Sequence, residues 1–155
     1  RITLSTVGVL PNLKSFLDDF KCHLAVSLHT PFDEERAALM PVQKAFKLED
    51  VISLIRSYDF TGQRRVSFEY IMFSGVNDTK RHADAMIRML SGLECRINLI
   101  RFHSIPGSSL QSSPRKRIDD FKARLNNAGI VTTLRASRGE DIMAACGLLA
   151  GQAKL

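Results

Sequence analysis

The stretch that decides the fold is residues 65–102, R-V-S-F-E-Y-I-M-F-S-G-V-N-D-T-K-R-H-A-D-A-M-I-R-M-L-S-G-L-E-C-R-I-N-L-I-R-F. It begins with Arg65–Phe73, an apolar run rich in aromatic and β-branched residues that is typical of a buried strand. In Asp78–Leu90 the apolar residues recur every three or four positions, which predicts an amphipathic helix. Cys95–Phe102 is a second strand-like run. A helix between two strands predicts a crossover that joins parallel strands, so we expect an α/β fold.

The same alternation of short strands and helices continues on both sides of this stretch. Short apolar runs predict strands, and segments with helical periodicity predict helices. The further strands expected are Ile2–Ser5, Cys22–Leu28 and Ile130–Leu134, and the further helices are Asn12–Phe20, Asp33–Leu39, Leu48–Tyr58, Arg115–Asn127 and Asp141–Ala150.

About five mostly parallel strands in residues 1–155 predict a single domain built on one sheet. A closed barrel of eight strands typically needs about 250 residues. We therefore expect an open, partial TIM-like barrel, corresponding to the C-terminal half of the closed form, with helices covering one side. In such folds the ligand binds at the carboxyl ends of the strands. The residues at those expected ends are polar or small: Ser5–Thr6, Ser27–His29, Ser74–Gly75, His103–Ser104 and Ser137–Gly139.

The composition is that of a basic globular protein. Apolar residues make up 45% and charged residues 25% of the chain, and the formal net charge is +6. This excess of positive charge favours a polyanionic partner such as RNA. The chain has no run of 18 apolar residues and no charged-then-apolar leader, so we expect neither a membrane span nor an export signal.

Cysteine usage indicates a reducing, cytoplasmic compartment. Cys22, Cys95 and Cys146 are odd in number and widely spaced, with no Cys-x-x-Cys pair. No histidine pair has the spacing of a zinc site, so we expect this chain to hold no metal of its own. Cys22 and Cys95 lie inside or at the start of expected strands and are expected to be core residues. The opening on a strand-like segment without an initiator Met predicts a piece of a longer protein.

Two histidines follow expected strands and are candidates for ligand binding. His29 closes the motif S-L-H-T-P, and His103 lies in R-F-H-S-I-P-G. Each is either a strand-end histidine bonded to the backbone or a hydrogen-bonding group for a ligand, in the case of His29 together with the Ser27 hydroxyl. Glu69 and Asp78 are candidate acids, although most such residues are solvated or cap helices.

A basic run and one cysteine also have a structural and a functional interpretation. Arg115, Lys116 and Arg117 form either a solvated first helical turn or a contact for phosphates. Cys146 lies in S-R-G-E-D-I-M-A-A-C-G-L-L-A-G, residues 137–151. Its small neighbours would let a bulky partner approach the sulfur, whereas most free cysteines are simply buried. On residue type alone both interpretations stand.

Taken together, several segments resemble the RlmN/Cfr family of radical S-adenosylmethionine (SAM) methyltransferases, which modify adenosine in ribosomal RNA and, for some members, transfer RNA. The resemblance agrees in order and spacing along nearly the whole chain, and its C-terminal segment is the most specific part. The matching segments are L-S-T-V-G-V-L-P at 4–11, A-V-S-L-H-T-P at 25–31, F-E-Y-I-M-F-S-G-V-N-D at 68–78, I-N-L-I-R-F-H at 97–103, and residues 137–151.

The resemblance implies roles for individual residues. Cys146 matches the cysteine that carries the methyl group in the family. Ser5, and then Ser27, Leu28 and His29, match residues that contact SAM. These positions fall at the carboxyl ends of the first two expected strands, where the fold class also predicts the ligand.

The chain departs from the family at one position, and other family groups are absent from it. His103 stands where the family has an asparagine contact to SAM, and an imidazole can still donate or accept a hydrogen bond, but not both from one group as an amide does. The family's cluster cysteines, in a C-x-x-x-C-x-x-C motif, are expected upstream of Arg1, with a catalytic glutamate and a second cysteine. We therefore expect the [4Fe-4S] cluster to be bound by a missing N-terminal part, and this chain to be inactive alone.

In the family, the counterpart of Cys146 takes a methyl group from one SAM, and a radical formed from a second SAM at the cluster activates it for addition to adenine. The resemblance therefore implies methylation of adenosine in 23S rRNA, and in tRNA for some members, with C2 favoured over C8 by analogy alone. It also implies an electron donor for the cluster. We expect the basic run and Arg138 to contact RNA.

Two other functions remain open at this point. A non-catalytic RNA-binding module would need the basic run of residues 115–117, but neither the Cys146 thiol nor the S-L-H segment. A phosphate-binding barrel enzyme of another chemistry would bind phosphate, rather than SAM, at the strand ends.

Overall fold

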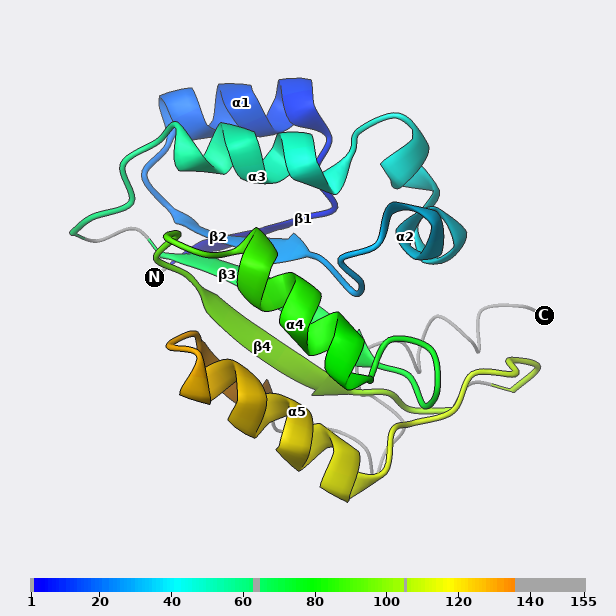
Figure 1. Cartoon of the computed structure of the whole chain (residues 1–155). Helices are drawn as coiled ribbons and strands as arrows, with labels where there is room; N and C mark the ends of the chain where they lie inside the picture. The colour runs from blue at the N-terminus through cyan, green and yellow to red at the C-terminus, as the bar shows by residue number, and fades with distance from the viewer. Residues whose placement is uncertain (1, 63–64, 105, 136–155) are drawn as a thin grey trace.

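A computed structural model describes residues 2–62, 65–104 and 106–135. The strands in this part form one five-stranded parallel sheet whose spatial order follows the chain, β1-β2-β3-β4-β5. The sheet is open, with β1 and β5 as its edges, so the predicted α/β fold with parallel strands is confirmed (Figure 1). The strands are β1 Thr3–Thr6, β2 His23–Ser27, β3 Val66–Met72, β4 Arg96–Arg101 and β5 Val131–Arg135.

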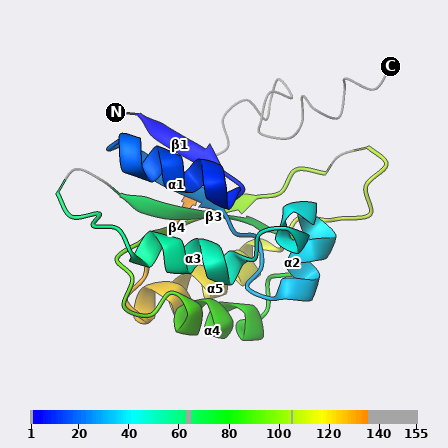
Figure 2. The same cartoon turned by 90° about the horizontal axis from the view of Figure 1, so that it is seen from above.

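The helices lie between consecutive strands, as right-handed crossovers require. Figures 1 and 2 show α1, α3, α4 and α5 side by side over the same face of the sheet. Residues 141–150, expected to form a last helix, lie outside the described residues. The helices are α1 Leu10–Asp19, α2 Asp33–Leu39, α3 Leu48–Arg56, α4 Lys80–Met89 and α5 Arg115–Asn127, with a 3₁₀ turn, η1, at Pro41–Lys44.

The core lies between the sheet and the helices because side chains alternate across each strand. In β3, Phe68, Tyr70 and Met72 are fully buried on the helix side. Burial of such side chains contributes about 1.5–3 kcal/mol each, so this layer supplies most of the driving force for folding. The intervening residues, such as Ser67 and Glu69, face the side of the sheet opposite to this core. That second face is hereafter called the open face.

Two cysteines expected in the core are only half-buried. Cys22 precedes β2 and Cys95 precedes β4, so each lies just outside its strand instead of within the alternating core pattern. Burial nevertheless raises the pKa of the Cys95 thiol to about 11, against an opposing effect of the Arg56 charge. Cys95 is therefore protonated and unreactive at neutral pH. None of the helices in the described residues combines the length and apolar character needed to span a bilayer.

Candidate functional site

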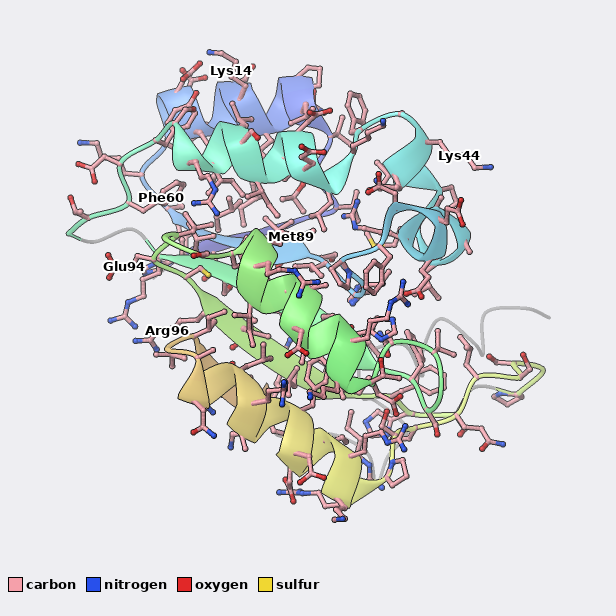
Figure 3. The ribbon with its side chains drawn as sticks, viewed as in Figure 1. Lys14, Lys44, Phe60, Met89, Glu94 and Arg96 are labelled. Atoms are coloured by element: carbon pink, nitrogen blue, oxygen red, sulfur yellow. The ribbon has the colours of Figure 1, made fainter. Side chains whose placement is uncertain are left out.

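A row of polar residues crosses the open face. The parallel register aligns Ser27 of β2 with Glu69 of β3, Glu69 with Asn98 of β4, and Asn98 with Thr133 of β5. Glu69, Asn98 and Thr133 line a groove of about 560 Å³ that also includes Ser5 and Ala25, the small side chains one pleat nearer the amino ends of the strands. Arg96, which begins β4 and is labelled in Figure 3, also lines this groove.

Hydrogen bonds connect three members of this row in one direction. The Thr133 hydroxyl donates to Asn98 Oδ1 at 3.1 Å, and Asn98 Nδ2 donates to Glu69 Oε1 at 3.1 Å. The second carboxylate oxygen, Glu69 Oε2, is buried and has no hydrogen-bond partner among the described residues. The chain of hydrogen bonds therefore ends in a buried acceptor that no donor among the described residues meets.

The turn after β2 places His29 beside this row. His29 has a φ of 61°, a left-handed conformation that is uncommon for a residue with a side chain. Its Nδ1 accepts a hydrogen bond from the backbone N–H of Ile71 at 3.0 Å, so the ring proton is assigned to Nε2. Burial, and then the charge of Arg36, lower the pKa of His29 to about 4. His29 is therefore neutral at physiological pH and presents Nε2–H as a donor.

Arg36, on α2, is fully buried and holds the ends of the first two strands. Its Nη2 donates to the carbonyls of Ser27 at 2.8 Å and of Val7 at 3.4 Å, and its Nε donates to the carbonyl of Leu28 at 3.1 Å. Nη1 donates to Gln43 Oε1 at 2.6 Å. Burial lowers its pKa to about 10, opposed by the charge of Asp33, so the guanidinium remains protonated. Arg36 thus fixes the backbone carbonyls of Ser27 and Leu28 in the S-L-H segment.

Asn77 performs the same task from the loop after β3. Its Nδ2 donates to the carbonyls of His29 at 2.6 Å and of Ile71 at 2.7 Å, while its Oδ1 accepts from the N–H of Phe73 at 2.8 Å. Asn77 is fully buried, so these bonds are shielded from competing water. The strained turn at His29 is therefore held by side chains from two other elements of the fold.

The structure brings some of the predicted SAM contacts together. Ser5 and Ser27 lie on the open face, and His29 lies at its carboxyl edge. Leu28 instead points into the core, and its backbone N–H donates to the Glu69 carbonyl at 2.9 Å. Its own carbonyl accepts from Arg36, so Leu28 contributes a fixed backbone more than a free polar group. His103 follows β4, and its side chain is half-buried.

The basic run occupies the first turn of α5, in the helix layer. Arg115 bonds to Asp119 at 3.0 Å within the helix, and Arg117 bonds to the buried carboxylate of Asp78 at 3.4 Å. Lys116 is exposed. Asp78, a candidate acid, also accepts from the Ser113 hydroxyl at 2.8 Å, so it is a buried hydrogen-bond acceptor and is not solvated.

Two predicted site residues, Cys146 and Arg138, lie outside the described residues. Within the described part, no three His, Cys, Asp or Glu side chains are grouped as metal ligands would be. Sequence reasoning did not single out Arg36, Asn77, Asn98 or Thr133. The period-two alternation of β4 and β5 was the available signal for Asn98 and Thr133, because polar residues alternate with the core residues there.

Known proteins share both the sequence and this arrangement of strands. No family model matches the chain. Proteins of Parabacteroides distasonis and Porphyromonas gingivalis, each named "probable dual-specificity RNA methyltransferase RlmN", are 57% and 58% identical to it over 149 residues. This chain is a homologue of the RlmN proteins. The resemblance predicted from its motifs is therefore confirmed, over 96% of this chain and 43% of each RlmN protein.

Solved structures agree with the RlmN homology. A radical SAM methyltransferase from Sphaerobacter thermophilus superposes with a TM-score of 0.90 at 40% identity, covering 96% of this chain and 44% of that one. A domain of a pyruvate-formate lyase-activating enzyme from Bacteroides vulgatus superposes with a TM-score of 0.66 at 14% identity, covering 86% and 80% of the two chains. The second match supports the fold alone. The predicted open α/β fold is thus confirmed, because the five parallel strands form one open sheet that superposes on a radical SAM methyltransferase.

Proposed function

We propose that this chain is part of a radical SAM methyltransferase that methylates adenosine in RNA, at C2, through an S-methylcysteine at Cys146. The observation that carries this proposal is the convergence of Ser5, Ser27 and His29 on one face and edge of the sheet. These residues match the family's SAM contacts, and Ser5 is 24 positions from His29 in the sequence.

The groups on the open face fit SAM. The nucleoside part of SAM carries hydroxyl and amino donors as well as ring acceptors. The face offers the unpartnered acceptor Glu69 Oε2, the donor His29 Nε2–H, and serine hydroxyls that serve as either. When bound, SAM would supply the methyl group and, with a [4Fe-4S] cluster held by residues outside this chain, the radical. The residues of this chain would bind and orient the nucleoside.

Cys146 would act as the nucleophile. Its thiolate forms a carbon–sulfur bond to the methyl group of SAM, while the sulfonium bond breaks and its electron pair stays on the departing S-adenosylhomocysteine. The RlmN homology supports this role, because the match covers 149 residues and the segment around Cys146 is the most family-specific part of the sequence.

RNA would be the substrate, as the name of the relatives states for them. We propose 23S rRNA, and transfer RNA as a second target, in the cytoplasm, with a separate electron donor for the cluster. The net charge of +6 supports a polyanionic substrate. Lys116 and Arg138 are the better candidates for phosphate contacts, because Arg115 and Arg117 are already paired with carboxylates.

Binding of S-adenosylhomocysteine to the full-length protein tests the proposal. We expect saturable binding by isothermal titration calorimetry and competition by SAM, because both ligands share the nucleoside that the open face would bind. Inorganic phosphate at the same concentration should not compete. A non-catalytic RNA-binding module predicts no binding of S-adenosylhomocysteine, and a phosphate-binding enzyme predicts competition by phosphate.

A further inference from the structure

Glu69 is the acidic side chain of the polar row, and only half of its hydrogen bonding is complete. Asn98 Nδ2 donates to Glu69 Oε1, and the Thr133 hydroxyl occupies Asn98 Oδ1. Because the Asn98 oxygen already faces a donor, its amide nitrogen must face Glu69. The carboxylate is therefore held by one oxygen, while the buried Oε2 has no donor among the described residues. A buried acceptor left without a donor costs free energy, so a donor is expected to reach it when the site is in use.

The neighbours of Glu69 favour a hydroxyl as that donor. Ser27 is in register with Glu69 on the neighbouring strand. Its hydroxyl can donate a hydrogen bond to a hydroxyl of the ligand, and that ligand hydroxyl can in turn donate to Glu69. One pleat away, Ser5, Ala25 and Ser67 are small, so short side chains form the floor of the groove next to Glu69. Each carboxylate oxygen has two acceptor positions, so Oε1 also retains one. Two acceptor oxygens on one carboxylate match the spacing of two neighbouring hydroxyls.

We propose that Glu69 accepts hydrogen bonds from the ribose 2′- and 3′-hydroxyls of the nucleoside bound on the open face. This inference rests on the proposed function, and it adds the residue that distinguishes a ribonucleoside from a deoxyribonucleoside. Asn98 and Thr133 act as positioning residues, because Asn98 holds the carboxylate through one amide hydrogen and Thr133 holds the Asn98 oxygen.

A comparison of two ligands on two variants tests the inference. The probes are S-adenosylhomocysteine and its 2′-deoxyribose analogue, titrated calorimetrically into the full-length protein. The wild type is expected to bind the deoxy analogue at least tenfold more weakly. Glu69→Gln should weaken binding of S-adenosylhomocysteine about 10- to 100-fold, as for loss of a hydrogen bond to a charged group, and should bind both ligands about equally.

Glu49→Gln is the matched control, because Glu49 is an exposed residue of α3 in the helix layer. It should retain both the affinity and the preference for the ribose ligand. Unchanged affinity and preference in Glu69→Gln would overturn the inference. An equal loss for both ligands that preserves their ratio would also overturn it, because Glu69 would then meet another donor of the ligand, such as an amine.

Two further outcomes separate this inference from the proposed function and from misfolding. If the wild type binds neither ligand, the proposed function itself fails. If thermal unfolding shows that Glu69→Gln does not fold, Asn98→Ala replaces it, since that variant keeps the carboxylate and removes its support. Asn98→Ala is expected to reduce the ribose preference several-fold, and an undiminished preference would contradict the role of Glu69.

Discussion

Replacement of Cys146 by alanine is expected to abolish methylation of RNA by the full-length protein, with a loss of about a thousandfold or more. Adenine C2 is not nucleophilic and cannot take an electrophilic methyl group directly. The thiolate must first accept that group, and alanine has no atom that can do so. The measurement is the yield of methyladenosine in RNA after anaerobic incubation with SAM and a reductant.

Cys95→Ala is the control for this prediction. Cys95 lies before β4, and burial raises the pKa of its thiol to about 11, so it is not a nucleophile at neutral pH. This variant should methylate RNA at close to the wild-type rate. Cys146→Ala should still bind S-adenosylhomocysteine, because the proposed nucleoside contacts lie on the open face. Methylation by Cys146→Ala at the wild-type level would exclude the S-methylcysteine intermediate.

Replacement of Arg36 by methionine is expected to lower the free energy of unfolding by about 3 kcal/mol, because it leaves buried carbonyl groups without donors. Methionine approximates the length of the arginine side chain but donates no hydrogen bond. The carbonyl of Ser27 and the side chain of Gln43 would lose partners at 2.8 and 2.6 Å. Urea unfolding followed by circular dichroism measures the change.

Arg56→Met is the matched control for Arg36→Met. Arg56 also donates to two backbone carbonyls, those of Met89 and Ser91, each at 2.9 Å, but it lies at the surface. Water replaces its hydrogen bonds, so we expect a loss under about 1 kcal/mol. Arg36→Met should in addition weaken binding of S-adenosylhomocysteine, because it frees the backbone of Ser27 and Leu28. Equal losses of stability in the two variants would show that Arg36 is not the buried clamp described above.

The fold was predictable because its signals are local. The apolar run in β3 and the helical periodicity of α4 identify a strand and a helix without reference to the rest of the chain. The helix bounds Asp33–Leu39 and Arg115–Asn127 agree with the structure. Each strand end differs by one residue; for example, β2 ends at Ser27 and not at Leu28. The last expected helix, residues 141–150, stays a prediction.

The site was only partly predictable because its supports are contacts between distant segments. Ser5, Ser27 and His29 were identifiable from family motifs. The sequence D-E-E-R-A-A-L indicates a helix with an acidic first turn, but nothing in it marks Arg36 as buried. Asn77 is 48 positions from the carbonyl of His29 that it binds. Such partners become visible only when the register of the sheet is known.

Glu69 illustrates the same limit. Its position in a strand with period-two alternation places it opposite to the core, and this much follows from the sequence. Its pairing with Asn98, and the lack of a donor for Oε2 among the described residues, depend on which strand lies next to β3. A glutamate in a strand is therefore identified as a site residue by its neighbours across the sheet.

The most direct test of the account is to follow a labelled methyl group. The full-length protein, with its cluster reconstituted anaerobically, is incubated with SAM carrying an isotope-labelled methyl group and then digested for mass spectrometry. We predict one labelled methyl group on the peptide that contains Cys146, and loss of this label to RNA when RNA and a reductant are added. RNA that becomes labelled while Cys146 never carries the methyl group would contradict the account.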